Sequence, residues 1–270
     1  MLASPSTHNM NSKTAMLQSI IAQNNQSVSL IERGEYEEAI VGFTSSISQW
    51  KTVIHDESSE RSLESSTRTA DEPSLPPLDK LMASDGVSCP MTTHIQHQAE
   101  DEDEHFEFLY EACILFPLDL DLARCENAFV ASVVVFNLAL AHQLWARSGL
   151  IETADAGHDS VNTPRKVLVR ASHLYDKCFK LAKEYSQYPK GSVLFQLAIA
   201  NNMGVLYSAL DRLESSEKCF QYVLATLMVL TAYRNYTMSP ILQNTSEETI
   251  GGFFANTTVL VTQAIGAPAA

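Results

Sequence analysis

Two distant stretches of the chain share one spacing of small and large side chains. Each begins with an asparagine, followed at fixed offsets by a small residue, a large one, a second small one and an aromatic one. The first copy is Asn25, Ser27, Leu30, Ala39 and Phe43, and the second is Asn202, Gly204, Tyr207, Ser216 and Phe220. A third copy has Asn137, Ala139 and His142, with Ala171 and Tyr175 displaced toward the C-terminus. An insertion therefore separates the halves of the third copy.

The spacing predicts pairs of antiparallel helices. Gly34-Glu35 and Asp211-Arg212 occupy equivalent positions between the halves of the two complete copies and mark tight turns. Two helices joined by such a turn approach closely only where side chains are small, so we expect the small residues at the crossings. The large residues then fill the space between successive hairpins, and each hairpin needs a neighbour to cover its apolar face.

This pattern resembles the tetratricopeptide repeat (TPR), a helix-turn-helix unit. The resemblance covers residues 20–53 and 197–230, and in part 132–147 plus 165–185. The chain departs from the family pattern because no tryptophan opens a repeat, Ser216 stands where alanine is usual, and no proline closes a unit. An amphipathic helical bundle whose periodicity mimics repeats remains the alternative.

The resemblance implies an all-α fold, an α-solenoid of stacked antiparallel hairpins with about three TPR-like repeats. Helix-start and helix-stop residues support this division: Thr163-Pro164 begins a helix to about Tyr185, and further helices are expected near 191–210, 213–234 and 246–264. The expected parts are a disordered N-terminus (1–14), a first repeat (15–53), an acidic disordered insert (54–105), an apolar extended segment (106–122), a second repeat (123–185, insertion at 148–163), a third repeat (191–234) and a C-terminal capping helix (245–264).

The segment 106–122 differs from the acidic sequence before it. Phe106, Phe108 and Tyr110 alternate with other residues at period two, which favours an extended conformation over a helix. Such a segment can form one small β element with residues near Met91–Ile95, lie along the helices as a docked peptide, or remain free. The sequence leaves these alternatives open.

The net charge of −14 is concentrated in one region, because residues 56–107 carry fourteen acidic and three basic side chains. No cluster of lysine and arginine is present, so we expect neither nucleic acid nor an anionic membrane as a partner. The N-terminus lacks the pattern of a secretory signal, and the longest apolar stretch, 128–141, is shorter than a membrane span and carries Ser132 and Asn137. Five scattered cysteines fit reduced thiols, so we expect an intracellular protein, cytoplasmic or nuclear.

The sequence contains no phosphate-binding loop, nucleophile elbow or HExxH motif, which predicts a protein that is not an enzyme and has no cofactor. One group, Cys89, His94, His97 and His105, lies near five consecutive acidic residues and offers metal ligands. A metal-dependent enzyme using these histidines is therefore a minor alternative. His142 stands where the repeat has a large packing residue, and we interpret it as a core or groove-edge histidine.

The resemblance to TPR proteins implies a concave groove, lined by the first helix of each hairpin, that binds a peptide or helix of another protein. The groove positions are Asn24, Val28, Phe136, Leu140, Ala198, Asn201, Val205 and Ser208. Repeats that clamp a carboxylate of a chaperone tail carry cations where this chain has Asn24, Ala198 and Asn202, so we expect no such clamp. Two binding hypotheses follow: an interaction scaffold, or a self-regulated binder with its own residues 106–117 in the groove.

Overall fold

The computed structural model describes residues 7–61, 108–117, 127–154, 162–185, 193–232 and 246–266. Within these ranges all regular secondary structure is α-helical, and there is no β-strand. The helices are α1 (Thr7–Glu32), α2 (Tyr36–Arg61), α4 (Asn127–Ala154), α5 (Asn162–Tyr185), α6 (Val193–Ala209), α7 (Leu213–Ala232) and α9 (Glu247–Gly266).

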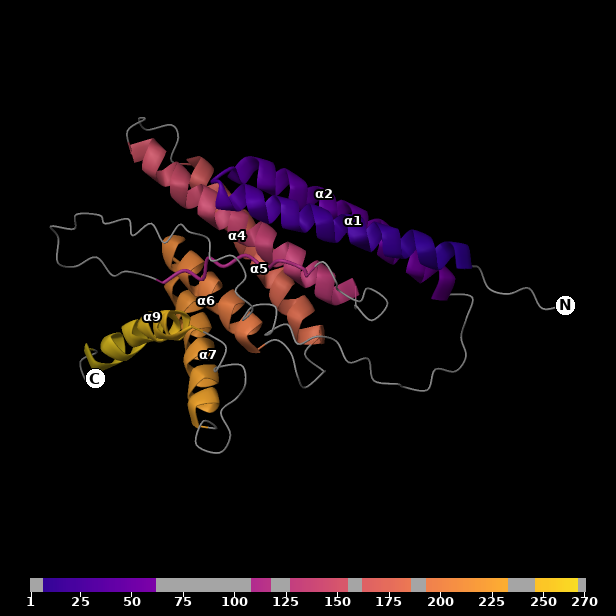
Figure 1. Cartoon of the computed structure of the whole chain (residues 1–270). Helices are drawn as coiled ribbons and strands as arrows, with labels where there is room; N and C mark the ends of the chain where they lie inside the picture. Colours follow the sequence, from indigo (N-terminus) through magenta and orange to yellow (C-terminus); the bar gives the residue numbers. More distant parts are fainter. Residues whose placement is uncertain are drawn as a thin grey trace.

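The helices pack in the order in which they occur along the chain. Helices α1 and α2, α4 and α5, and α6 and α7 form three antiparallel hairpins, and α9 packs against α7. Successive hairpins are joined by contacts of α2 with α4 and of α5 with α6 (Figure 1). The first helices of neighbouring units also touch, since α1 contacts α4 and α6 contacts α9.

The two predicted turns have the same backbone conformation. Gly34 and Asp211 both lie in the left-handed region, with φ of 77° and 60°. Glu35 N–H donates to Leu30 C=O at 2.9 Å, and Arg212 N–H donates to Tyr207 C=O at 2.8 Å, so equivalent residues close both turns. The equivalence of the turn sequences therefore extends to their hydrogen bonds.

Small residues lie where the helices of a hairpin cross. A Cβ atom on Gly204 would stand 2.5 Å from the Phe220 ring, and the Ser216 hydroxyl donates to the Gly204 carbonyl at 2.8 Å. In the first hairpin Gly42 lies against Ser27, and Ala39 and Phe43 are fully buried. Ala139, Ala171 and Tyr175 are fully buried as well, and Tyr207 is half-buried.

Several helices are longer than the sequence predicted. Helix α1 includes residues 7–14 and α2 includes residues 54–61, so neither range is wholly disordered as expected. Helix α4 continues to Ala154 and so contains the first part of the predicted insertion at 148–163. Extending a helix that has already formed adds one backbone hydrogen bond for each residue that is fixed. The polar ends of α1, α2 and α4 therefore continue helices that are nucleated by their buried turns. The ends of α5, α6, α7 and α9 lie within two residues of the expected positions.

Helix α4 contains a long apolar stretch. Its residues 128–148 are long and apolar enough to cross a membrane, but most of them are buried within the protein. In the part of the chain that the structure describes this is the one such helix, and one is weak evidence for a span. As expected, no unbroken run of apolar residues in the chain is as long as a membrane span. The mean hydropathy of residues 128–148, however, does reach the level of a membrane-spanning helix. Buried apolar residues from all the hairpins form one continuous core around α4.

Residues 108–117 form no helix and run across the helices as an extended chain (Figure 1). Leu109, Tyr110, Ile114 and Phe116 belong to the buried core. Of the three alternatives for this segment, the structure has the one in which it lies along the helices. Its proposed β partner near Met91–Ile95 lies outside the described residues.

Candidate functional site

Four asparagines, one from each of four helices, bind the backbone of residues 108–117. We call Asn25, Asn137, Asn202 and Asn256 the asparagine ladder, and residues 108–117 the extended segment. Each side-chain amide accepts the N–H and donates to the C=O of one residue, so each makes a pair of hydrogen bonds. The pairs join Asn256 of α9 to Phe108 (2.7 and 2.6 Å), Asn202 of α6 to Tyr110 (2.9 and 2.9 Å), Asn137 of α4 to Ile114 (2.9 and 2.8 Å) and Asn25 of α1 to Phe116 (2.9 and 2.8 Å).

The bound residues follow from the geometry of an extended chain. In such a chain the N–H and C=O of one residue point to the same side, and those of the next residue point to the opposite side. All four residues held by the ladder are even-numbered, so they present their backbone to the same row of helices. Ala112 is also even-numbered, but no ladder asparagine binds it, because the segment crosses there from α6 to α4.

Two further asparagines connect the ladder. Asn24 donates to Ile114 C=O at 3.1 Å and accepts from Asn137 at 3.0 Å. Asn201 donates to Phe108 C=O at 3.0 Å and accepts from Asn256 at 2.6 Å. Asn24 therefore couples the first hairpin to the second, and Asn201 couples α6 to α9.

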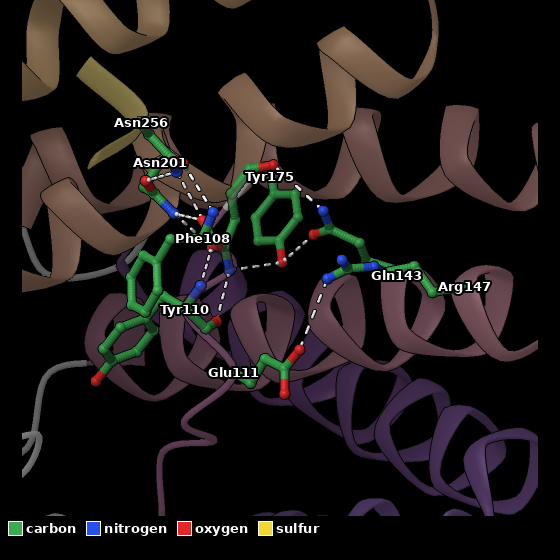
Figure 2. A network of polar contacts seen from close by, with 9 residues as sticks. Phe108, Tyr110, Glu111, Gln143, Arg147, Tyr175, Asn201 and Asn256 are labelled. Atoms are coloured by element: carbon green, nitrogen blue, oxygen red, sulfur yellow. Dashed lines mark hydrogen bonds and ion pairs between the residues drawn. The ribbon is translucent and has the colours of Figure 1, made fainter. Parts of the chain in front are cut away.

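A buried tyrosine, Tyr175, holds the ladder residue Asn202 in place through a hydrogen bond (Figure 2). The Tyr175 hydroxyl donates to Gln143 Oε1 at 3.0 Å and accepts from Asn202 Nδ2 at 3.2 Å. Burial raises the pKa of Tyr175, so its hydroxyl stays protonated and available as a donor. Helix α5 thereby fixes the orientation of an asparagine on α6.

The side chains of the extended segment pack into the helices. The Phe108 ring lies directly over Gly252, where an added Cβ atom would overlap it, and meets Phe253 edge-on at 5.6 Å. The Tyr110 ring stacks on Phe253 at 5.9 Å and contacts Phe136 at 6.4 Å. At the other end Phe116 meets Phe129 edge-on at 6.0 Å.

One charged pair accompanies these contacts. Glu111 of the extended segment lies 3.6 Å from Arg147 of α4, and both side chains are partly exposed (Figure 2). Partial burial raises the pKa of Glu111, and the nearby Arg147 acts in the opposite direction. An ion pair of this exposure contributes at most about 1 kcal/mol.

The predicted groove residues lie beneath or beside the extended segment to different degrees. Asn24 and Asn201 bind its backbone, and Phe136 contacts Tyr110. Val28, Leu140, Ala198 and Val205 are buried in the core, whereas Ser208 is only half-buried. That these residues contact a partner stays a prediction.

His142 is buried at 3% exposure, and its Nδ1 atom has no hydrogen-bond partner. Burial, and secondly Arg170, lower its pKa to about 4. Its surroundings fit a neutral packing residue. The predicted metal ligands Cys89, His94, His97 and His105 lie outside the described residues, and the described ones contain no group of three metal-ligating side chains.

Sequence reasoning identified three of the four ladder positions as repeat residues but missed Asn256. A signal was present: in every copy the asparagine precedes a small residue by two positions, and Asn256 precedes Thr258 in the same way. Thr258 is exposed because no second helix follows α9 to cover it in the described residues. Without that second helix, α9 does not show the full repeat spacing.

Comparison of the chain with protein-family models, curated proteins and solved structures gave no match.

Proposed function

We propose that the chain is a non-enzymatic interaction scaffold, a TPR-like α-solenoid whose concave face binds an extended peptide of another protein. We further propose that the extended segment is the resident occupant of this face and that a partner must displace it. The observation that carries the proposal is the asparagine ladder, because paired hydrogen bonds to one backbone residue at a time suit recognition of an extended peptide.

Because the asparagines recognise the main chain of the extended segment, another peptide can chemically take its place. The ladder touches only N–H and C=O groups, which every residue except proline offers. A foreign peptide in the same conformation can therefore satisfy the same asparagines. The aromatic and aliphatic contacts would then select among such peptides.

Removal of the extended segment without a replacement is unfavourable in free energy. Asn24, Asn137, Asn201 and Asn202 are at or near zero exposure, and a buried polar group left without a partner costs about 1–3 kcal/mol. The large apolar side chains around them would also become exposed. Replacement of one extended peptide by another therefore costs less than opening of the face.

Covalent attachment gives the resident segment an advantage over a partner. An attached ligand competes at an effective concentration of the order of millimolar. A partner at about 1 μM must then bind roughly a thousandfold more tightly than the segment, or the segment must first be weakened. This requirement is the basis for self-regulation in the proposal.

The test uses the full chain and a fluorescent peptide with the sequence of residues 107–117. Ile114→Asp places a charge where Ile114 is 2% exposed and should release the segment, whereas Val41→Asp adds the same charge at a site that is 69% exposed. We expect the Ile114→Asp chain to bind the peptide at least about 10-fold more tightly than either the unchanged chain or the Val41→Asp chain. Fluorescence anisotropy measures the binding.

A milder change, Phe116→Ala, keeps the test informative if the charged variant Ile114→Asp does not fold. It removes the ring contact with Phe129 but keeps both hydrogen bonds to Asn25. We expect a smaller gain in peptide binding, in the same direction. Equal, weak binding by all the chains, with helical circular dichroism retained, would contradict the proposal.

A further inference from the structure

The spacing of the ladder restricts the peptide that the face can hold. From α9 to α1, the bound residues are separated by two, four and two positions, as Phe108, Tyr110, Ile114 and Phe116 show. Each of these positions must supply an N–H, so proline is excluded there. The N-terminal end of the peptide lies at α9 and the C-terminal end at α1, opposite to the order of the helices in the chain.

The α9 end of the face accommodates two aromatic rings. Gly252 leaves the space that the Phe108 ring fills, since any larger residue on α9 would overlap that ring. Two positions later, the Tyr110 ring lies on Phe253, which is itself fully buried. Aromatic pairs in such arrangements contribute beyond their buried area, which favours aromatic residues over aliphatic ones at both positions.

The middle of the face carries a positive charge. Arg147 lies beside the position of Glu111, at the point where the segment crosses from α6 to α4 without a ladder contact. The side chains at 112 and 113 are only half-buried, so these two positions are less restricted.

The α1 end accommodates one aliphatic and one aromatic side chain. Ile114 and Phe116 are each 2% exposed, and Phe116 packs against Phe129 of α4. Leu115 between them is only half-buried, and its backbone makes no hydrogen bond with a ladder asparagine.

From these contacts, and from the burial of Leu109 at 6% exposure, we infer that the partner presents an extended peptide with the order aromatic, aliphatic, aromatic, acidic, any, any, aliphatic, any, aromatic. The inference rests on the proposed function and adds the partner's chemistry to it. Specificity comes from the aromatic pair at α9, the acidic residue at Arg147 and the absence of proline at the four ladder positions. The half-buried positions between them, 112, 113 and 115, are less restricted.

Single changes in the labelled 107–117 peptide test this pattern against the full-length Ile114→Asp chain. Ile114→Pro in the peptide removes an N–H that Asn137 accepts, while Leu115→Pro removes none that the ladder uses. We expect the first change to weaken binding by at least about 10-fold and the second by less than about 3-fold. Phe108→Ala should weaken binding by about 10-fold, because the space over Gly252 is left empty.

The charge at Arg147 has a reciprocal test. Glu111→Arg in the peptide should weaken binding by about 3-fold, and Arg147→Glu in the protein should restore it. If the unchanged peptide binds but every altered peptide binds equally well, the inferred pattern is wrong and the proposed function stands. If the unchanged peptide does not bind, the proposed function itself fails.

Discussion

At the scale of single residues, asparagine suits the ladder because its planar amide carries one acceptor and two donors on a short side chain. One amide can therefore accept the N–H and donate to the C=O of the same residue, as Asn137 does with Ile114. Its second donor hydrogen remains available, and Asn137 uses it on Asn24. Aspartate has the same shape but no donor when it is ionised.

Replacement of Asn137 by aspartate should consequently destabilise the fold by about 3 kcal/mol. The change removes the donors to Ile114 C=O and to Asn24, and it buries a negative charge beside two oxygen atoms. Urea unfolding followed by circular dichroism measures the loss. The control Gln26→Glu adds the same charge at an exposed position of α1 and should change stability by less than about 0.5 kcal/mol. Equal effects of the two changes would contradict the ladder contacts.

His142 should make the protein sensitive to acid. Its pKa in the folded chain, lowered to about 4, lies below the ordinary value of 6.5, so protonation favours the unfolded state. The stability that depends on neutral His142 is fully present above pH 6.5 and is lost as the pH falls toward 4. His142→Leu, which places an aliphatic residue as at Leu30, should flatten the pH dependence of the unfolding free energy in this range. Parallel pH curves for the two chains would show that His142 does not contribute.

At the scale of helices, the close crossings depend on single glycines. Gly204→Ala should destabilise the α6–α7 hairpin by about 1–3 kcal/mol, although alanine favours a helix by about 1 kcal/mol, because the added carbon meets the Phe220 ring at 2.5 Å. Gly251→Ala is the matched control, since no atom lies within 4 Å of its Cβ position. The control should raise stability by up to about 1 kcal/mol in thermal unfolding. A gain in stability at both positions would contradict the crossing.

Helix α9 is attached to the rest of the fold partly through the extended segment. Phe253 contacts the rings of Phe108 and Tyr110, and Asn256 binds the Phe108 backbone. Phe108→Ala should therefore increase amide exchange in α9 by roughly tenfold and leave α1 and α2 unchanged. Hydrogen-exchange mass spectrometry of residues 247–258 measures this. Val229→Ala, at an exposed position of α7, should have no such effect.

The elements differ in how far the sequence could predict them. Helix bounds and turns follow from local patterns, so α5, α6 and α7 and the two left-handed turns were predicted to within two residues. The place of the extended segment depends on contacts with residues 23 to 148 positions away, such as Asn137, Asn202 and Asn256, which no local pattern encodes. Period-two alternation predicted its extended conformation but not its binding site. The same distance explains why asparagines recognised as repeat markers were not recognised as backbone ligands.

At the scale of the whole molecule, the extended segment contacts residues of all four structural units and runs antiparallel to their order. Its side chains complete a core that the three hairpins and α9 share. Through the paired amides of Asn24 and Asn201, neighbouring units are joined by the same groups that bind the segment. Binding of the extended segment and cohesion of the hairpins are therefore coupled.

The most direct test of this account is residue-resolved amide exchange in the full chain by NMR. We predict slow exchange for the N–H groups of Phe108, Tyr110, Ile114 and Phe116, which ladder asparagines accept, and faster exchange for Ala112 and Leu115. Uniformly fast exchange from 108 to 117 would show that the asparagines do not hold the segment, and it would contradict the central claim.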